Sequence, residues 1–294
     1  MPIHPTASVS PQCQIAPDAE VGPHCVLTGA VKLCAGVRLL GNVYVSGPCA
    51  IGEGTMIYPF ACIGFPGQDV KFKPGDPTTG VVIGTHGIIR EHATVHAATK
   101  PDRPTIIGDR VFMMVNSHVG HDGLVGNNVV MVNNSAIGGH AQLFDNCTLG
   151  GGALIHQFNR VGRFAFVSGG VACSADVPPF CISDERNRIA GLNLVGLQRN
   201  GFSRDQVSAL RRAFRDLFRT TVPREEMIRV LRERGADCPP LIEMAEFVET
   251  LGQGRSKPRA MCAGPGRPPR SVAALLQKLG KSGAAIGEEQ LEEA

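Results

Sequence analysis

The sequence predicts a mainly β protein in which a parallel β-solenoid of triangular cross-section precedes a small α-helical domain. The first observation is an aliphatic residue at every sixth position, in runs from Ile3 to Ile63, from Ile83 to Val95 and from Ile107 to Cys173. This period matches neither the helical period of about 3.6 nor the alternation of a strand. Three such units would close a coil of 18 residues with the aliphatic side chains inside. The second observation is that helical spacing replaces this period after about residue 185.

A second row of residues, four positions after each aliphatic one, is small and is predicted to face the narrow interior as well. It includes Cys13, Cys25, Cys49 and Cys147, while Cys173 occupies an aliphatic position. Buried cysteine behaves as a small apolar residue, and no Cys-x-x-Cys pair occurs among the ten cysteines. We therefore expect these cysteines to be structural, and neither disulfide partners nor metal ligands.

Two segments rich in Pro, Gly, Asp and Lys interrupt the six-residue period, near 65–82 and near 97–106. We expect both to be loops inserted into the solenoid, which is predicted to span residues 1–185. Loops on a rigid scaffold often carry binding residues.

Residues 186–252 are predicted to form an α-helical C-terminal domain. Ser203 fits the N-cap of a helix, and Pro223 opens a second helix that ends near Arg234. A third helix is predicted from Leu241 to Leu251. The segment 253–294 is rich in Gly, Pro and Arg and is expected to be a basic, flexible extension, with a short helix at 271–279.

Composition restricts the class of partner. No apolar run reaches the roughly 18 residues that a membrane span needs, and the N-terminus lacks the pattern of a secretory signal, so we expect a cytoplasmic protein with no integral membrane segment. Seven of the 29 Lys and Arg residues, but only four of the 26 acidic residues, fall in 253–294, so the remainder is neutral. A nucleic-acid partner is therefore not expected.

Four of the nine histidines, His118, His121, His140 and His156, fall within 39 residues of the regular repeat. Steps of 18 residues place His121 beside Gly139 and Gln157 on successive coils, and Asp122 beside His140. This clustering favours a functional site over isolated, solvated histidines.

Two chemistries fit the cluster. Three histidines could bind a metal ion and leave a coordination position open for water. Alternatively, His121 could act as a general base whose second ring nitrogen is held by Asp122, because an imidazole with a pKa near about 6.5 accepts protons at neutral pH. The N–H of Gly139 could then stabilise an oxyanion. The His121–Asp122 dipeptide favours acid–base chemistry and makes a catalytically silent scaffold improbable.

Five motifs resemble segments of the acyl-carrier-protein:UDP-N-acetylglucosamine O-acyltransferases, and the similarity covers roughly residues 1–250. They are Asn116-Ser117-His118-Val119-Gly120-His121-Asp122, Gly138-Gly139-His140, His156-Gln157-Phe158, Asp176-Val177-Pro178-Pro179-Phe180 and Gly196-Leu197-Gln198-Arg199-Asn200-Gly201-Phe202-Ser203. The resemblance implies a left-handed parallel β-helix and a homotrimer with active sites between subunits. It also implies transfer of a (3-hydroxy)acyl chain from acyl-carrier protein to the 3-hydroxyl of UDP-N-acetylglucosamine, the first step of lipid A biosynthesis, without a cofactor.

The resemblance also implies roles for individual residues. His121 would remove the proton of the sugar 3-hydroxyl, Asp122 would orient His121, and the Gly139 N–H would stabilise the oxyanion. Four residues would line the substrate cleft: His118, His140, His156 and Gln157. Asn193 and Arg199 match positions near the nucleotide, and Asp69 and Lys71 match positions that contact the sugar and the acyl donor. Gly169 matches the position that limits acyl length, with Phe166 nearby.

The sequence departs from the family pattern at two places near the nucleotide positions. The segment Asp184-Glu185-Arg186-Asn187-Arg188 replaces a turn of a different type, and Asn200 replaces a second basic residue. Transfer to another amino-sugar nucleotide, transfer from coenzyme A, and a metal-dependent hydratase on the same fold remain alternatives.

The helical region is basic, with ten Arg against five acidic residues in 199–234, including Arg211, Arg212 and Arg215. Such a surface would attract an acidic carrier protein. Charged helix faces are also commonly just solvated, and the sequence does not separate these two interpretations.

Overall fold

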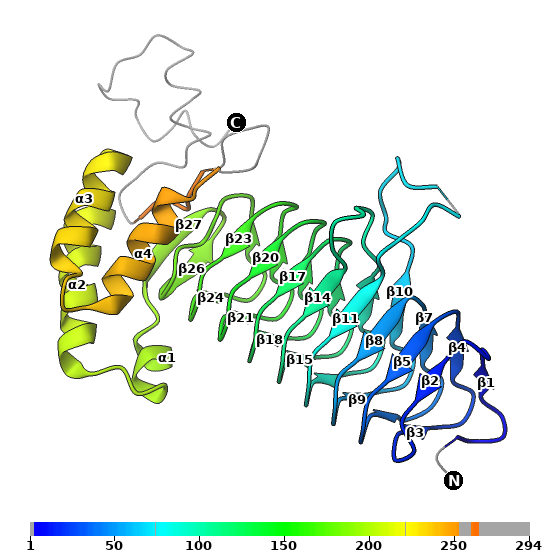
Figure 1. Cartoon of the computed structure of the whole chain (residues 1–294). Coiled ribbons are helices and arrows are strands. Elements are labelled where there is room, and N and C mark those ends of the chain that lie inside the picture. Colours follow the sequence, from blue (N-terminus) through cyan, green and yellow to red (C-terminus); the bar gives the residue numbers. More distant parts are fainter. Residues whose placement is uncertain (1–2, 74, 221, 253–259, 265–294) are drawn as a thin grey trace.

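A computed structural model describes residues 3–73, 75–220, 222–252 and 260–264. Three parallel sheets form the faces of a triangular solenoid, and four helices follow at its C-terminal end (Figure 1). The predicted fold class, a left-handed parallel β-helix followed by a small helical domain, is confirmed.

The chain visits the three sheets in turn. Sheet 1 contains β1 (Ser8–Val9), β4 (Val26–Thr28), β7 (Tyr44–Ser46), β10 (Cys62–Phe65), β13 (Thr94–His96), β16 (His118–Val119), β19 (Ala136–Ile137), β22 (Leu154–Ile155) and β25 (Ala172–Cys173). Sheet 2 contains β2 (Gln14–Ile15), β5 (Val31–Leu33), β8 (Cys49–Ile51), β11 (Val81–Ile83), β14 (Thr105–Ile107), β17 (Leu124–Val125), β20 (Gln142–Leu143) and β23 (Arg160–Val161). Sheet 3 contains β3 (Glu20–Val21), β6 (Arg38–Leu39), β9 (Met56–Ile57), β12 (Ile88–Ile89), β15 (Phe112–Met113), β18 (Val130–Met131), β21 (Thr148–Leu149), β24 (Phe166–Val167), β26 (Cys181–Glu185) and β27 (Arg188–Leu192).

The register of the sheets follows the six-residue period. Val119 pairs with Ile137 and Ile137 with Ile155, each 18 positions later. The first insertion lengthens this step, so that Val81 pairs with Cys49, and the second places Thr105 beside Val81. Both insertions therefore leave the stacking of the coils unchanged and project from the solenoid as loops.

The core is a column of aliphatic and small side chains. Ile137 and Leu149 have no exposed surface, and neither do Ala141 and Cys147 from the row of small residues. Because a hexapeptide coil encloses little volume, one large and one small side chain per unit fill it. The buried cysteines are thus packing residues.

Many corners of the solenoid contain a residue in the left-handed backbone region. Asn116, Asn128 and Asn134 have φ between 55° and 61°, and Asp122 and His140 occupy equivalent positions with φ of 58° and 60°. Asn and Asp tolerate this region better than most residues. Two predicted site residues are therefore also corner residues.

The sequence predicts a helical part that begins at residue 186. The first helix begins at Leu194 instead. The reason is a β-hairpin, in which β26 and β27 pair antiparallel and extend sheet 3. The helices are α1 (Leu194–Arg199), α2 (Arg204–Phe218), α3 (Arg224–Arg234) and α4 (Pro239–Glu249). Ser203 caps α2, where its hydroxyl accepts from the N–H of Gln206 and the Gln206 side chain reciprocates.

A buried arginine of the solenoid, itself held by an ion pair, contacts the helical part. Arg160 Nε donates to Asp176 Oδ2 at 2.7 Å, and its guanidinium also donates to the carbonyl of Phe247 in α4. Backbone hydrogen bonds of Asp176 hold residues 260–262 against the last coil. Residues 260–264 of the expected flexible extension are therefore in contact with the solenoid, whereas the short helix expected at 271–279 lies outside the described residues.

Within the part of the chain that the structure describes, no helix is both long and apolar enough to cross a lipid bilayer.

Candidate active site

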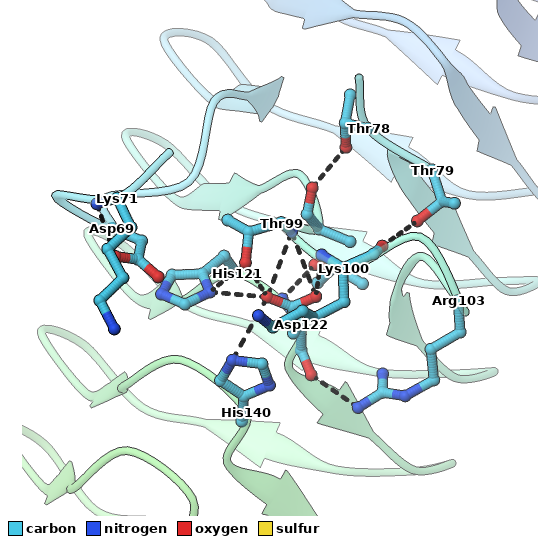
Figure 2. A network of polar contacts seen from close by, with 12 residues as sticks. Asp69, Lys71, Thr78, Thr79, Thr99, Lys100, Arg103, His121, Asp122 and His140 are labelled. Atoms are coloured by element: carbon cyan, nitrogen blue, oxygen red, sulfur yellow. Dashed lines mark hydrogen bonds and ion pairs between the residues drawn. The ribbon is translucent and has the colours of Figure 1, made fainter. Parts of the chain in front are cut away.

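Both insertion loops and the His121–Asp122 pair lie on one edge of the solenoid. The first loop joins β10 to β11, the second joins β13 to β14, and His121 lies between β16 and β17. In each case the chain leaves sheet 1 and enters sheet 2. Successive coils thus bring the loops and His121 together (Figure 2), along what we call the loop edge.

The side chain of Asp122 is the centre of the polar network on the loop edge. Its Oδ1 accepts from the backbone N–H groups of Thr99 at 3.1 Å and of Lys100 at 3.0 Å. Its Oδ2 accepts from the Thr99 hydroxyl and from His121 Nδ1, each at 2.7 Å. Burial raises the pKa of Asp122, but the hydrogen bonds from His121, Thr99 and Lys100 outweigh burial and hold this pKa well below its ordinary value. Asp122 is therefore a fixed anion.

The backbone of Asp122 is also held by the second loop. Its N–H donates to the Thr105 hydroxyl at 2.9 Å, and its carbonyl accepts from Arg103 Nη2 at 2.9 Å. These contacts stabilise a residue that has positive φ. The second loop thus fixes both the position and the charge of the carboxylate.

The contact with Asp122 determines the tautomer of His121. Because a carboxylate can only accept, Nδ1 of His121 carries the hydrogen and Nε2 is left with a lone pair. A Cβ atom added to Gly139 would lie 2.5 Å from this Nε2, and one added to Gly67 would lie 2.7 Å from the His121 Cβ. The imidazole therefore lies between two glycines that leave its basic nitrogen unobstructed.

Gly139 lies next to this nitrogen, and its N–H donates no backbone hydrogen bond within the described residues. The N–H of the following residue, His140, does donate, to the His121 carbonyl at 2.9 Å. Gly139 thus offers a backbone donor on the coil beside His121 that has no backbone partner within the described residues. An oxyanion formed there would be stabilised by it.

His140 packs on the other side of Asp122. Its Nε2 lies 3.6 Å from Asp122 Oδ2, and its ring stacks on Phe158 with centroids 4.4 Å apart. Burial lowers the pKa of His140; Asp122 opposes this, while the charges of His121, Lys100 and Arg103 lower it further.

His118 and His96 form a second pair on the same coils. Their rings meet edge to face with centroids 4.8 Å apart, and His118 Nδ1 lies 2.7 Å from the Thr94 hydroxyl. Burial, and then repulsion from His118 and His121, lowers the pKa of His96 to about 4. Burial and repulsion from His121 also lower the pKa of His118. These imidazoles are therefore neutral near pH 7.

A cavity of about 290 Å³ lies between the two loops, next to the network around Asp122. Asp69 and Lys71 from the first loop line it, together with Thr99 and Lys100 from the second. The carboxylate of Asp69 accepts the N–H of Lys71 at 2.9 Å, which fixes the turn of the first loop. Asp69 and Lys71 thus lie beside the His121 cluster, although they are about 50 positions away in sequence.

His156 and Gln157 follow β22 on the loop edge, two coils after His121, and both side chains are exposed. Phe166 and Gly169 do not lie there: β24 belongs to sheet 3, and the chain then enters sheet 1. Asn193 and Arg199 follow β27, also in sheet 3. The predicted residues thus form two groups, on two different edges of the same chain.

The residues that follow the strands of sheet 3 differ from one another in exposure and in hydrogen bonding. The Asn193 side chain caps α1, accepting from the Gly196 N–H at 3.0 Å, and donates to the Phe164 carbonyl at 2.9 Å. Arg199 is exposed. Gly169 is exposed, and a Cβ atom there would lie 3.2 Å from the carbonyl oxygen of Gly151 on the neighbouring coil.

The two departures from the family pattern have structural roles. Asn187 turns the chain between β26 and β27 and exchanges hydrogen bonds with Ser174. Arg188 pairs with Asp184 at 2.6 Å. Asn200 ends α1, where its side chain donates to the Gly196 carbonyl.

Several residues of the site are absent from the sequence-based prediction, among them Gly67, His96, Thr99 and Lys100. Gly67, Thr99 and Lys100 belong to the loops, where the six-residue period gives no register. His96 precedes the second loop on β13, which pairs with β16. The register sets Thr94 opposite His118, so it could have placed His96 two residues along the same face.

His121, Asp122 and His140 also place three potential metal ligands within 4.8 Å of one another. The donor set fits a metal poorly, because both oxygens of Asp122 already accept hydrogen bonds and His121 Nδ1 donates one of them. Coordination would require these contacts to break. The geometry favours acid–base chemistry.

Comparisons with known proteins agree on one family. The family model for domain 2 of UDP-N-acetylglucosamine O-acyltransferase matches residues 176–261. The acyl-[acyl-carrier-protein]–UDP-N-acetylglucosamine O-acyltransferase of Thermodesulfovibrio yellowstonii is 40% identical over 254 residues, which cover 86% of this chain and 98% of that protein. The Rhizobium etli enzyme of the same name is 39% identical over 248 residues, 84% of this chain and 90% of that protein.

Solved structures give the same result. UDP-N-acetylglucosamine O-acyltransferase from Moraxella catarrhalis superposes with a TM-score of 0.82 at 32% identity and covers 87% of this chain and 100% of that one. UDP-N-acetylglucosamine acyltransferase from Francisella novicida gives a TM-score of 0.84 at 28% identity, over 97% of this chain and 100% of that one.

The neutral His96 provides a test of the site's electrostatics. In the folded protein, ¹³C-histidine NMR should show His96, assigned with the His96→Gln variant, titrating near pH 4, whereas in urea it should titrate near the ordinary value of about 6.5. Because the folded pKa is the lower one, folding loses stability as the pH falls from about 6.5 towards 4. A folded-state midpoint near 6.5 would contradict the described packing.

Proposed function

Since the chain belongs to the acyl-[acyl-carrier-protein]–UDP-N-acetylglucosamine O-acyltransferase family, we propose that His121 is the general base of this reaction. The chain is an acyltransferase that moves an acyl group from acyl-carrier protein to UDP-N-acetylglucosamine, the opening step of lipid A biosynthesis. The residue roles that follow belong to the proposal.

The observation that carries the proposal is the hydrogen bond of 2.7 Å between His121 Nδ1 and Asp122. It leaves the lone pair of Nε2 directed at the space beside the Gly139 N–H. There, Nε2 accepts the proton of the sugar 3-hydroxyl while the oxygen attacks the thioester carbonyl. The imidazolium that forms is stabilised by the Asp122 anion.

The Gly139 N–H donates to the oxyanion of the tetrahedral intermediate. When the intermediate collapses, the C–S bond breaks and the protonated His121 returns its proton to the departing thiolate. The acyl oxygen ester and a free thiol result, and His121 is neutral again. The reacting groups on the loop edge are surrounded by four further residues, His118, His140, His156 and Gln157. Each of the three histidines can donate a hydrogen bond to a sugar or accept one from it.

We also propose a homotrimer, because the predicted substrate residues lie on two edges of one chain. The loop edge carries His121, Asp69 and Lys71, whereas Asn193, Arg199, Phe166 and Gly169 follow strands of sheet 3. A second copy is needed to bring the two groups into one cleft. Contact between different edges of successive copies is heterologous and closes as a ring.

In this arrangement the acyl chain would pass Gly169, where the absence of a side chain leaves space, and Phe166 would limit its length. Arg199 would bind the nucleotide. The Asn193 side chain acts indirectly, since both of its polar groups are used to start α1.

Carrier-protein docking is proposed for the exposed arginines of α2. Arg215 pairs with Asp216 at 3.1 Å, but Arg211 and Arg212 have no ion pair within the described residues. Two unpaired cations on one helix favour an acidic partner. A cytoplasmic location is proposed because acyl-carrier protein and a sugar nucleotide are both cytoplasmic substrates.

Replacing His121 tests the mechanism. His121→Ala should lower kcat by about 10²- to 10⁴-fold or more, because no other group can take the hydroxyl proton at that position. The assay is mass spectrometry of the O-acylated sugar nucleotide with a panel of acyl-carrier-protein donors, and circular dichroism should show an intact solenoid. His24→Asn, at an exposed corner far from the loop edge, is the matched control and should retain full activity.

Near-normal turnover by folded His121→Ala protein would exclude His121 as the base. In the same assay, preference of the wild-type protein for coenzyme A donors or for an amino-sugar acceptor would replace the proposed substrates with those alternatives.

Mixed oligomers test the shared site. His121→Ala and Arg199→Glu chains should each be nearly inactive alone, but co-expression should restore activity, because some clefts then combine an intact His121 with an intact Arg199. If mass analysis shows mixed oligomers and their activity does not exceed that of either parent, the site does not lie between subunits.

A further inference from the structure

The proposed mechanism leaves one charged side chain of the site without a role. Lys100 lies in the second loop, directly after Thr99, and its backbone N–H helps to hold Asp122. Its side chain is exposed and has no ion pair within the described residues. Its positive charge is nevertheless close enough to His140 to lower that residue's pKa.

The surroundings of Lys100 indicate what it could bind. It lines the cavity between the loops together with Lys71 from the other loop (Figure 2). The two aspartates of this cavity are already used within the first loop: Asp69 accepts the N–H of Lys71, and Asp76 accepts the N–H of Lys73 at 2.8 Å. Each carboxylate keeps its charge but has one oxygen occupied by a backbone N–H, whereas the two ammonium groups have no hydrogen-bond partner or ion pair within the described residues.

Arg103 adds to the positive potential without competing for a ligand. Its guanidinium donates to the carbonyls of Asp122 at 2.9 Å and Pro104 at 3.3 Å, so its hydrogen-bonding groups are partly occupied while its charge remains. Lys71 and Lys100 thus line the cavity, and Arg103 adds a third positive charge on the other side of Asp122. Such an arrangement favours an anion over a neutral sugar or an acyl chain.

We propose that Lys100, together with Lys71, binds phosphate oxygens of a substrate at the entrance to the active site. Lysine binds phosphate as a point charge and needs no fixed donor geometry, which suits two lysines on separate loops. This inference rests on the proposed function, whose two substrates both contain phosphate. The sugar nucleotide carries a diphosphate, and the carrier protein carries the phosphodiester of its pantetheine arm.

The structure also shows why a substitution of Lys100 should leave the catalytic geometry intact. Asp122 is held by the backbone N–H of Lys100 and not by its side chain. Lys100→Met therefore removes the charge and retains the hydrogen bond. Lys73→Met is the matched control, because Lys73 lies in the first loop and does not line the cavity.

The experiment compares two minimal donors, acyl-phosphopantetheine and acyl-pantetheine, which differ only in the phosphate. If the donor phosphate is the ligand, Lys100→Met should lower kcat/KM about tenfold for acyl-phosphopantetheine and less than twofold for acyl-pantetheine. If the nucleotide diphosphate is the ligand, the KM of UDP-N-acetylglucosamine should rise about tenfold and both donors should be affected equally. Lys100→Arg should restore activity in either case, and Lys73→Met should behave as wild type.

Two results would overturn the proposal. In the first, the kinetic constants of Lys100→Met, measured with both donors and with the nucleotide, lie within about twofold of those of Lys73→Met. In the second, Lys100→Met has a lower kcat, every KM is unchanged and the two donors behave alike. That result would indicate a structural effect. Both require an active wild-type enzyme; a wild-type protein without turnover on these substrates would contradict the proposed function instead.

Discussion

Backbone hydrogen bonds hold each coil of the solenoid on the last, with residues 18 positions apart in register, as Val119 and Ile137 are. This register depends on one aliphatic and one small side chain per six-residue unit, which together fill the prism. It converts sequence spacing into position in space. His121 and Gly139 meet because they are one coil apart, and so do Asp122 and His140. The site is therefore as rigid as the stacking of the coils, and its two glycines are required by the close approach of the His121 ring.

The second loop adds the contacts that hold the Asp122 carboxylate. It returns over Asp122 with two N–H groups and a hydroxyl. These contacts keep Asp122 ionised despite its burial. The anion in turn fixes the tautomer of His121. Burial and nearby positive charges lower the pKa values of His96, His118 and His140. The Asp122 carboxylate is thus a buried charge that lies directly against the base.

The accuracy of the sequence-based prediction follows the regularity of the chain. The repeat predicted the three-sided solenoid and the neighbours of His121, because a fixed period determines every contact along an edge. It could not place Thr99 or Lys100, since their position depends on the path of a loop and not on a period. It also placed the start of the helical part too early, because the hairpin of β26 and β27 continues sheet 3 without the repeat. The family resemblance supplied the substrates, which the local geometry alone does not identify.

The central claim is that the Asp122 anion makes His121 a base. Asp122→Asn tests it directly, because the amide oxygen can still accept from Thr99 and Lys100 while the amide nitrogen faces His121. The ring would then carry its hydrogen on Nε2, where the substrate hydroxyl should donate. We expect kcat to fall by about 10²- to 10⁴-fold with the solenoid intact and KM little changed. A folded Asp122→Asn protein that retains kcat within about threefold of wild type would contradict this account.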